Sequence, residues 1–318
     1  MKSFHFQIKT LWLLKISLSL IFFLVLSSFA FGNPSALSQS YVPTDDVRQW
    51  MEQRFAKGVI PPFSFVYGGK KSDSFIRNWQ YQSEKIPSSE PNQEKYVYRY
   101  TDKATGLTVK CTVTCFTDFP AVEWVLHFSN ASGKNTPAIE KVAVADHAFI
   151  ADGNGGFILH HAKGSDAQRS DFQPVDEPLQ VGKPVYMTPS RGRSSEETAL
   201  PFFNIAMPGQ QGMMVAVGCT GKWYADITQT DAQTVSLKSG MERMKLTLLP
   251  GEEIRTPKIC LLFWKGEDRM TGHNQFRQFI LAHYSRKING RFAEYPLAGG
   301  FRFGDDYPCH ENECTTEE

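Results

Sequence analysis

Leu107-Thr-Val-Lys-Cys-Thr-Val-Thr-Cys115 alternates apolar and polar residues, and Val122, Trp124, Leu126 and Phe128 repeat the alternation a few residues later. A period of two residues places successive side chains on opposite faces of a β-strand. Comparable short runs continue to about residue 264, with Gly-rich and Pro-rich turn signals between them. The pattern predicts an all-β fold, a large antiparallel β-sandwich with a few peripheral helices.

Two segments outside the strands have helical spacing of their apolar residues. The first is predicted to begin after an N-cap at Thr44 and to end at Gly58. The second covers residues 272–284, where Phe276 and Phe279 share one face, and Asn289-Gly290 is predicted to end that segment.

The composition excludes several classes of protein. The chain has 318 residues, 34 Lys+Arg against 33 Asp+Glu, and 13% aromatic residues. A disordered chain would have fewer aromatic residues and a larger net charge. Binding to nucleic acid through counterion release needs a basic surface, so a net charge of +1 argues against a nucleic-acid partner.

The first 32 residues resemble a signal peptide. The apolar run Ile16 to Leu26 follows three lysines and precedes small residues at Ala30 and Gly32. The run is shorter than the roughly 20 residues that a membrane span needs. We therefore expect cleavage of residues 1–32, export to the periplasm or the medium, and no stable membrane span afterwards. A retained N-terminal anchor is the alternative.

The six cysteines fit an exported protein but are too few for a dense disulfide framework. Cys111 and Cys115 fall on the same face of one strand, too far apart to bridge comfortably. Cys309 and Cys314 share a polar loop and are the candidate disulfide. That loop lacks a second pair of ligands for a metal ion, so no metal and no other cofactor is predicted.

The densest polar cluster lies in a loop after the strand-like run that ends at Leu159. Its candidate carbohydrate-binding residues are Asp166, Gln168, Arg169 and Asp171. Carboxylates, an amide and a guanidinium together suit vicinal hydroxyl groups, which both donate and accept hydrogen bonds. The alternative is that Arg169 pairs with Asp166 or Asp171 and only holds the loop in place.

A second polar cluster contains Arg193 and Glu196, which are candidates for another wall of the same site. The alternative is a solvated charged turn. Trp223 is a candidate for stacking on a sugar ring, and its alternative is a buried place in a sheet. No nucleophile elbow, zinc-protease motif, phosphate loop or dinucleotide fingerprint is present in the sequence, so no catalytic residue is assigned.

An ordered set of strings resembles a known family. The strings are Phe119-Pro-Ala-Val-Glu-Trp124, Gly164 to Phe172, Gly192 to Asn204, Gly218-Cys-Thr-Gly-Lys-Trp223, Pro250 to Pro257, Phe276 to Tyr284, and Ala298-Gly-Gly300. Together they resemble the N-terminal half of secreted bacterial α-galactosidases of glycoside hydrolase family 36.

The resemblance implies a β-supersandwich over residues 33–270 and a connecting helix over 271–290. Residues 291–318 would begin a (β/α)8 barrel, with Leu297 to Phe303 as its first strand. In that family a retaining mechanism uses two carboxylates about 5 Å apart, on later strands of the barrel. We therefore expect this chain to lack the catalytic residues and to be inactive alone.

The partners implied by the resemblance are an α-galactoside and the missing catalytic barrel, and assembly into a homo-oligomer stays open. Two other functions are compatible with the residues. The first is a non-catalytic carbohydrate-binding β-sandwich module, and the second is a structural interaction domain in which the polar clusters only support the fold.

Overall fold

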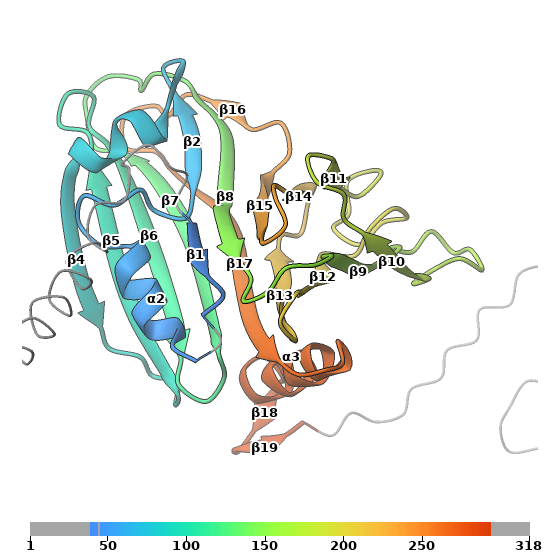
Figure 1. Ribbon diagram of the computed structural model, residues 1–318. Helices are drawn as coiled ribbons and strands as arrows, with labels where there is room; N and C mark the ends of the chain where they lie inside the picture. Colours follow the sequence, from blue (N-terminus) through green and yellow to red (C-terminus); the bar gives the residue numbers. More distant parts are fainter. Residues whose placement is uncertain (1–38, 44, 294–318) are drawn as a thin grey trace, which may run out of the picture.

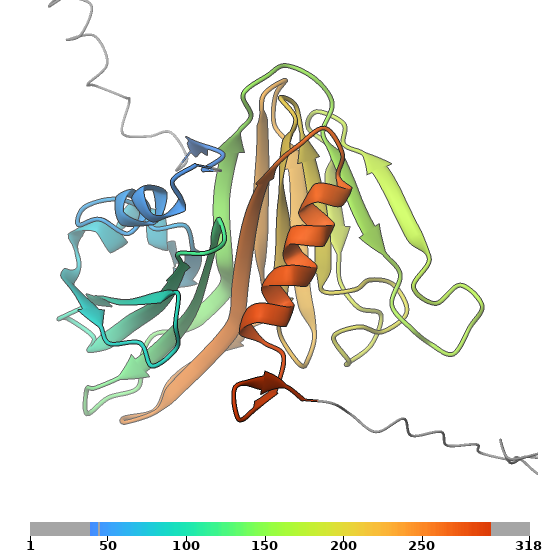
Figure 2. The ribbon, with the colours of Figure 1, turned by 90° about the horizontal axis from the view of Figure 1, so that it is seen from below.

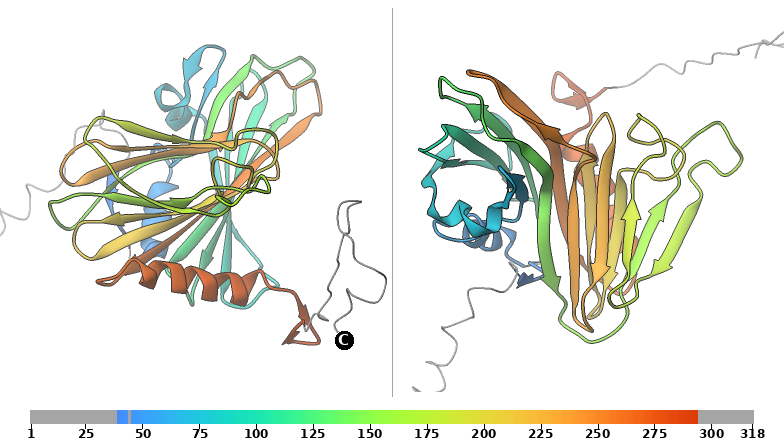
Figure 3. Two further views of the ribbon diagram at one scale, coloured as in Figure 1. Left: turned by 90° about the vertical axis from the view of Figure 1, so that its right-hand side faces the viewer. Right: turned by 90° about the horizontal axis from the view of Figure 1, so that it is seen from above.

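The computed structural model describes residues 39–43 and 45–293 and places them in two packed β-sheets with two α-helices (Figure 1, Figure 3). The predicted all-β sandwich with peripheral helices is confirmed. The predicted leader, the first barrel strand and the Cys309–Cys314 disulfide lie outside the described residues.

Sheet A has the strand order β11-β14-β15-β8-β2-β3, and β1 and β16 also pair with β8. Its pairs are antiparallel except for β1 with β8. Its strands are β1 (Gln39–Tyr41), β2 (Ser64–Tyr67), β3 (Lys70–Lys71), β8 (Ile139–Ile150), β11 (Pro184–Met187), β14 (Trp223–Gln229), β15 (Thr234–Met241) and β16 (Lys245–Leu246). Two short 3-10 helices, η2 (Ser72–Ser74) and η3 (Ile76–Asn78), follow β3.

Sheet B is antiparallel throughout, with the order β10-β9-β12-β13-β17-β7-β6-β5-β4. Its strands are β4 (Gln80–Ile86), β5 (Gln93–Thr101), β6 (Leu107–Phe116), β7 (Ala121–Asn130), β9 (Ile158–Ala162), β10 (Pro174–Pro178), β12 (Phe202–Met207), β13 (Gln211–Gly218) and β17 (Glu253–Lys265). The hairpin of β9 and β10 extends away from the rest of the sandwich (Figure 1).

Strand β6 shows why the alternating pattern produces this sandwich. Leu107, Val109 and Val113 are fully buried on its inner face, and Val113 lies opposite Trp124 of β7. Cys111 and Cys115 share that face as unpaired, buried thiols, as predicted. Removing these apolar side chains from water is the main free-energy gain of the core.

Helix α2 (Val47–Arg54) packs between the two sheets (Figure 1). Asp46 caps it by accepting the backbone N–H of Gln49 at 2.7 Å, so the prediction of Thr44 as the cap is wrong. An aspartate directly before the first helical residue reaches the N3 amide more readily than a residue two positions earlier. The ring of Phe55 stacks on Tyr98 of sheet B, and Trp50 stacks on Phe149 of sheet A.

Sheet B is covered on both faces where β17 crosses its centre. Along Ile259–Trp264 the odd-numbered residues enter the main core between the sheets, and Cys260, Leu262 and Trp264 enter a second apolar cluster outside it. Helix α3 (Met270–His283) supplies the cover of that second cluster and lies along the outer face of sheet B (Figure 2). A strand that is buried on both faces has a continuous apolar sequence, as β17 does.

The indole of Trp264 lies between two glycines. A Cβ atom added to Gly212 of β13 would come within 2.3 Å of the ring, and one added to Gly272 of α3 within 2.5 Å. Trp264 Nε1 donates a hydrogen bond to Asn204 Oδ1 at 2.9 Å, and the Asn204 amide in turn donates to the Arg269 carbonyl at the start of α3. These contacts set the distance between helix and sheet.

The segment after α3 differs from the prediction in one respect. The helix ends at His283, and Asn289 and Gly290 form the turn of a short hairpin of β18 (Lys287–Ile288) and β19 (Arg291–Phe292). Both residues have positive φ, 53° and 78°, which an Asn-Gly pair adopts readily in a two-residue hairpin turn. Neither described helix is long and apolar enough to cross a membrane.

We expect Gly272→Ala to destabilise the protein by about 1–3 kcal/mol, because the methyl group would collide with the Trp264 ring. Helix propensity alone predicts the opposite sign, since alanine is better than glycine within a helix by about 1 kcal/mol. Urea unfolding measures the change. Gly133→Ala, in open space, is the matched control. Equal or greater stability of Gly272→Ala would show that α3 does not pack in this position.

Candidate functional site

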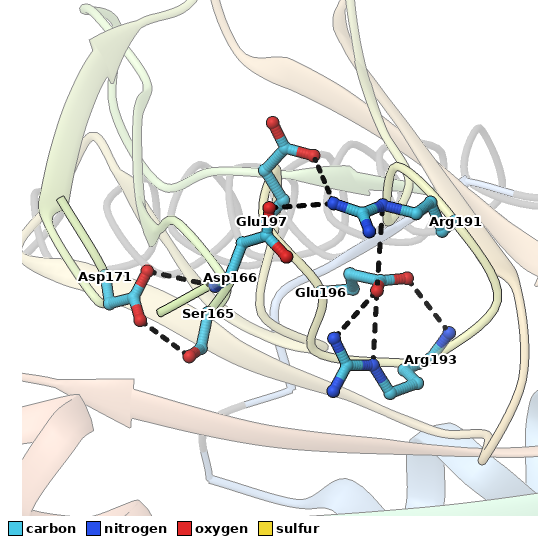
Figure 4. Close-up of polar contacts among 7 residues, drawn as sticks. All are labelled: Ser165, Asp166, Asp171, Arg191, Arg193, Glu196 and Glu197. Carbon is cyan, nitrogen blue, oxygen red and sulfur yellow. Dashed lines mark hydrogen bonds and ion pairs between the residues drawn. The ribbon is translucent and has the colours of Figure 1, made fainter. Parts of the chain in front are cut away.

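The structure brings the two predicted polar clusters together (Figure 4). The loop after β9 and the loop before β12 run side by side, and Ser165 and Glu196 form an isolated parallel bridge. The Ser165 amide donates to the Ser195 carbonyl at 2.9 Å, and the Gly164 amide donates to the Glu197 carbonyl at 3.0 Å. The two loops therefore form one structural unit.

Gly164 allows the close approach of these loops. A Cβ atom there would lie 2.3 Å from the Ser195 carbonyl oxygen and 2.6 Å from the Glu196 carbonyl carbon. Only a residue without a side chain fits against backbone atoms at this distance.

Glu196 is the buried centre of the cluster, with 4% of its surface exposed. Its Oε1 atom accepts hydrogen bonds from Arg193 Nη2 at 2.8 Å and Arg193 Nε at 3.2 Å. Arg191 Nε lies 3.8 Å from the same oxygen. The Arg193 hydrogen bonds lower the pKa of Glu196, because they stabilise its charged form.

The carboxylates of the first loop are also paired. Asp166 accepts from Arg191 Nη2 at 2.7 Å. Asp171 accepts the backbone N–H of Asp166 at 3.0 Å and the hydroxyl of Ser165 at 2.7 Å. These two bonds, the amide first, lower the pKa of Asp171. The partner of Asp166 is therefore Arg191 of the other loop, and the alternative in which Arg169 pairs with Asp166 or Asp171 is wrong.

Gln168 and Arg169 remain exposed at the tip of the first loop, next to Ala167 with a φ of 59°. Arg169 has no ion-pair partner within residues 45–293. The side chains of Arg191 and Arg193 are 60% and 72% exposed although each binds a carboxylate. The donors available to a ligand are consequently these side chains, while the carboxylates mainly hold the loops.

Trp223 cannot stack on a ligand, which corrects the prediction. It is fully buried, and its Nε1 donates to the Ser194 carbonyl at 2.7 Å. Alternation along β14 places it inward with Ala225 and Ile227, so that it supports the second loop from below. Arg191 is the residue of the cluster that the sequence candidates missed. The basic sequence Arg191-Gly-Arg193 could have drawn attention to Arg191. Its pairing could not be predicted, because its partner Asp166 lies on another loop.

An apolar pocket of about 470 Å³ lies between the second of these loops and α3. Ser194 and Ser195 form one side, and Phe202 and Phe276 form the apolar part, with ring centroids 5.9 Å apart. At the far end, the hydroxyl of Tyr284 donates to the buried carboxylate of Glu123 of β7, which also accepts from Lys258 Nζ at 2.7 Å.

The arrangement does not resemble a catalytic centre. Within the described ranges no three His, Cys, Asp or Glu side chains gather as metal ligands. The carboxylates of the cluster are bound to arginines or to hydroxyl and amide groups, and a carboxylate held in its charged form in this way is a poor proton donor. The cluster can hold two loops rigid and present guanidinium groups beside an apolar pocket.

Gly164→Ala should separate the two loops, because the added methyl group would collide with the backbone of the second loop. Limited proteolysis should then cut within residues 163–173 or 188–200 faster than in the unaltered protein. Gly192→Ala, where a Cβ atom meets open space, should leave the cleavage rate unchanged. Equal rates for both variants would contradict the close contact.

The effect of Glu196→Gln should depend on pH. The pKa of Glu196 is depressed in the folded protein, so its contribution is present above the ordinary value of 4.5 and is lost as pH falls through the folded value. Melting temperatures should be lower for Glu196→Gln than for the unaltered chain at pH 7, and the difference should shrink below about pH 4.5. Glu267→Gln, at an exposed residue, is the control. A difference that is the same at pH 7 and pH 3 would contradict this assignment.

No protein-family model and no curated protein matches this sequence. Solved structures with a similar fold include several α-galactosidases. The enzyme from Lactobacillus brevis is 16% identical with a TM-score of 0.56, and the match covers 72% of this chain and 33% of that enzyme. The galactosidase domain of the α-galactosidase-sucrose kinase AgaSK is 15% identical with a TM-score of 0.53, covering 71% and 34%.

The GH36 α-galactosidase AgaB from Geobacillus stearothermophilus is 14% identical with a TM-score of 0.50, covering 65% of this chain and 30% of that enzyme. This chain therefore spans about a third of the length of the enzymes it matches. The predicted resemblance is confirmed at the level of the fold: the described residues have the β-sandwich architecture of one region of GH36 α-galactosidases.

Proposed function

We propose that this β-sandwich is the non-catalytic domain of a glycoside hydrolase that acts on α-galactosides, and that a separate barrel supplies the two catalytic carboxylates. The observation that carries the proposal is the fold shared with about a third of each α-galactosidase. The loop cluster has no pair of free carboxylates for acid–base chemistry, which agrees with a non-catalytic role.

The surface beside α3 supports the proposal because it has the character of an interface. Phe202 and Tyr284 are 46% and 48% exposed, and both line the pocket of about 470 Å³ together with Phe276 and Ile280. A contiguous apolar surface on a soluble domain usually marks a contact with another protein surface. We propose that the catalytic barrel packs here.

The charged loop cluster adjoins this surface through Ser194 and Ser195. A barrel seated on α3 would therefore have the exposed side chains of Gln168, Arg169 and Arg193 close to its edge. The hydrogen bonds of Glu196 and Trp223 to the second loop would hold these donors in place. Binding of a sugar would then cost little conformational entropy. We propose these donors as the residues of this domain that approach a sugar.

The substrate class follows from the relatives. A variant of AgaA, a GH36 α-galactosidase from Geobacillus stearothermophilus with a TM-score of 0.50, was crystallised with stachyose. We propose α-galactosides of this kind as the substrate of the complete enzyme. From the leader-like residues 1–32 we also propose that the protein is exported to the periplasm or the medium.

The purified chain should not hydrolyse an aryl α-galactoside, because in the proposal the two catalytic carboxylates belong to the separate barrel. Turnover above the solvent background would contradict the proposal. Placing residues 45–293 in the Lactobacillus brevis enzyme, in exchange for the matching region, should preserve its hydrolysis of the same substrate. Phe202→Asp in this chimera should lower activity or yield at least several-fold, because it would bury a charge in the apolar contact.

Val181→Asp is the matched control for the chimera, since Val181 is 59% exposed on a loop away from the α3 surface. Equal effects of the two substitutions would contradict barrel docking at α3. Calorimetry of the chain with galactose and melibiose addresses the alternative of a carbohydrate-binding module. Saturable heat with either sugar in the millimolar range would favour that module over the non-catalytic domain of an enzyme.

A further inference from the structure

A second cavity, of about 540 Å³, lies on the outer face of sheet A. It shares no lining residue with the pocket beside α3. Tyr224 and Asp146 lie at its base, and η2 with the segment around Ile60 forms its sides. The volume is in the range of roughly 300–1,000 Å³ that small-molecule sites occupy.

Strand register assembles the base of this cavity. Asp226 of β14 lies opposite Lys238 of β15, which lies opposite Asp146 of β8. The next outward residue of β14 is Tyr224, and its partner on β15 is Gly240. A Cβ atom at Gly240 would lie 2.3 Å from the Val142 carbonyl oxygen, so a glycine is needed there for the close approach of β8 to β15.

Tyr224 is held in a fixed orientation by a second tyrosine. The ring of Tyr186 on β11 stacks on it with centroids 6.0 Å apart and an interplanar angle of 14°. Of the two rings only Tyr224 lines the cavity, and Tyr186 supports it from one side. The part of the Tyr224 ring that faces the cavity is an apolar surface that suits the C–H face of a pyranose ring.

The polar groups of the cavity are a carboxylate with a hydroxyl group on one side and cations on the other. The Asp146 carboxylate accepts from the Ser64 hydroxyl at 2.5 Å and lies 3.7 Å from Lys238 Nζ. It retains acceptor capacity for sugar hydroxyl groups, since a carboxylate has about four lone-pair sites. Lys71 and Arg77 line the other side, and neither has an ion-pair partner within residues 45–293.

Lys141 is a third cation of the cavity without an ion-pair partner among the described residues. Its position results from a register shift between β2 and β8. The pairing of β2 with β8 shifts register between Ser64 and Val66, and Lys141 on β8 has a φ of 51°. Its amide donates to the Met244 carbonyl at 3.1 Å, so this unusual backbone conformation is held by a hydrogen bond. A bulge of this kind redirects a side chain, here to the cavity that Lys141 lines.

We propose that this cavity binds an anionic sugar. Tyr224 would contact the sugar ring, and Asp146 and Ser64 would bind its hydroxyl groups. Lys71, Arg77 and Lys141 would pair with its carboxylate or phosphate. Lysine and arginine form their strongest hydrogen bonds with such anionic oxygens. The four cations of the lining exceed the two carboxylates, Asp73 and Asp146, so a neutral sugar would leave the excess charge unpaired.

The test uses isothermal titration of the whole 318-residue chain at pH 7 with galacturonate, galactose 6-phosphate and galactose. The three sugars differ at the sixth carbon, so they isolate the anionic group. Saturable binding of galacturonate or of the phosphate, without binding of galactose at the same concentration, is the expected result. The sugar that binds more tightly, galacturonate or galactose 6-phosphate, shows whether the cavity prefers a carboxylate or a phosphate.

Lys141→Gln should weaken the binding of the anionic sugar about tenfold, since one charged hydrogen bond is lost. Tyr224→Leu should weaken it as well by removing the aromatic face. Lys103→Gln, at an exposed lysine of the β5–β6 turn, should leave it unchanged. Melting temperatures of all variants ensure that only folded proteins are compared.

Absence of binding by both anions, equal binding of galactose, or the same affinity for Lys141→Gln as for Lys103→Gln would overturn the proposal. None of these outcomes bears on the proposed role in an α-galactosidase, because that proposal rests on the fold and on the surface beside α3. Conversely, failure of the chimera would leave the anionic-sugar site standing.

Discussion

The packing of Trp264 between Gly212 and Gly272 is the contact on which the arrangement of this domain depends. It allows α3 to lie close against β17, and so turns the outer face of sheet B into a second apolar cluster. Sheet B is then buried on both sides at its centre, while sheet A keeps an outer face open to solvent. The two faces consequently take different roles. The covered face ends in an apolar surface beside α3, and the open face carries a polar cavity that Tyr224 lines.

In the charged loops the carboxylates serve to hold one loop against the other. Burial of Glu196 would be costly without a partner, and the Arg193 fork offsets that cost with charged hydrogen bonds. The same pairing keeps the carboxylate ionised and leaves the outer side of the guanidinium in solvent. The pairing therefore holds the two loops together beside the apolar pocket.

Local patterns were sufficient for some elements and insufficient for others. The alternation of β6 and β7 and the helical spacing around Phe279 depend on one segment at a time, and both predictions are confirmed. The pairing of Asp166 with Arg191 joins two loops that are 25 residues apart, and it depends on the backbone bridge at Gly164. Arg169 is nearer than Arg191 to Asp166 in the sequence, but proximity along the chain did not identify the ion-pair partner of Asp166. For Trp223 the sequence left two interpretations, stacking on a sugar and burial in the sheet, and the structure shows burial. The sequence could not decide between them, because alternation shows which residues share a face but not which face is buried.

The all-β class, the two helical segments and the resemblance to one region of α-galactosidases could be predicted from the amino-acid sequence, because periodicity and ordered motifs are properties of the chain alone. Which residues meet became known from the folded structure. The stacking of Tyr186 on Tyr224, the position of Lys141 at a bulge and the two-sided burial of β17 all arise from the register between strands that are distant in the chain. Register follows from the packing of both faces of a sheet at once, and no single segment contains that information.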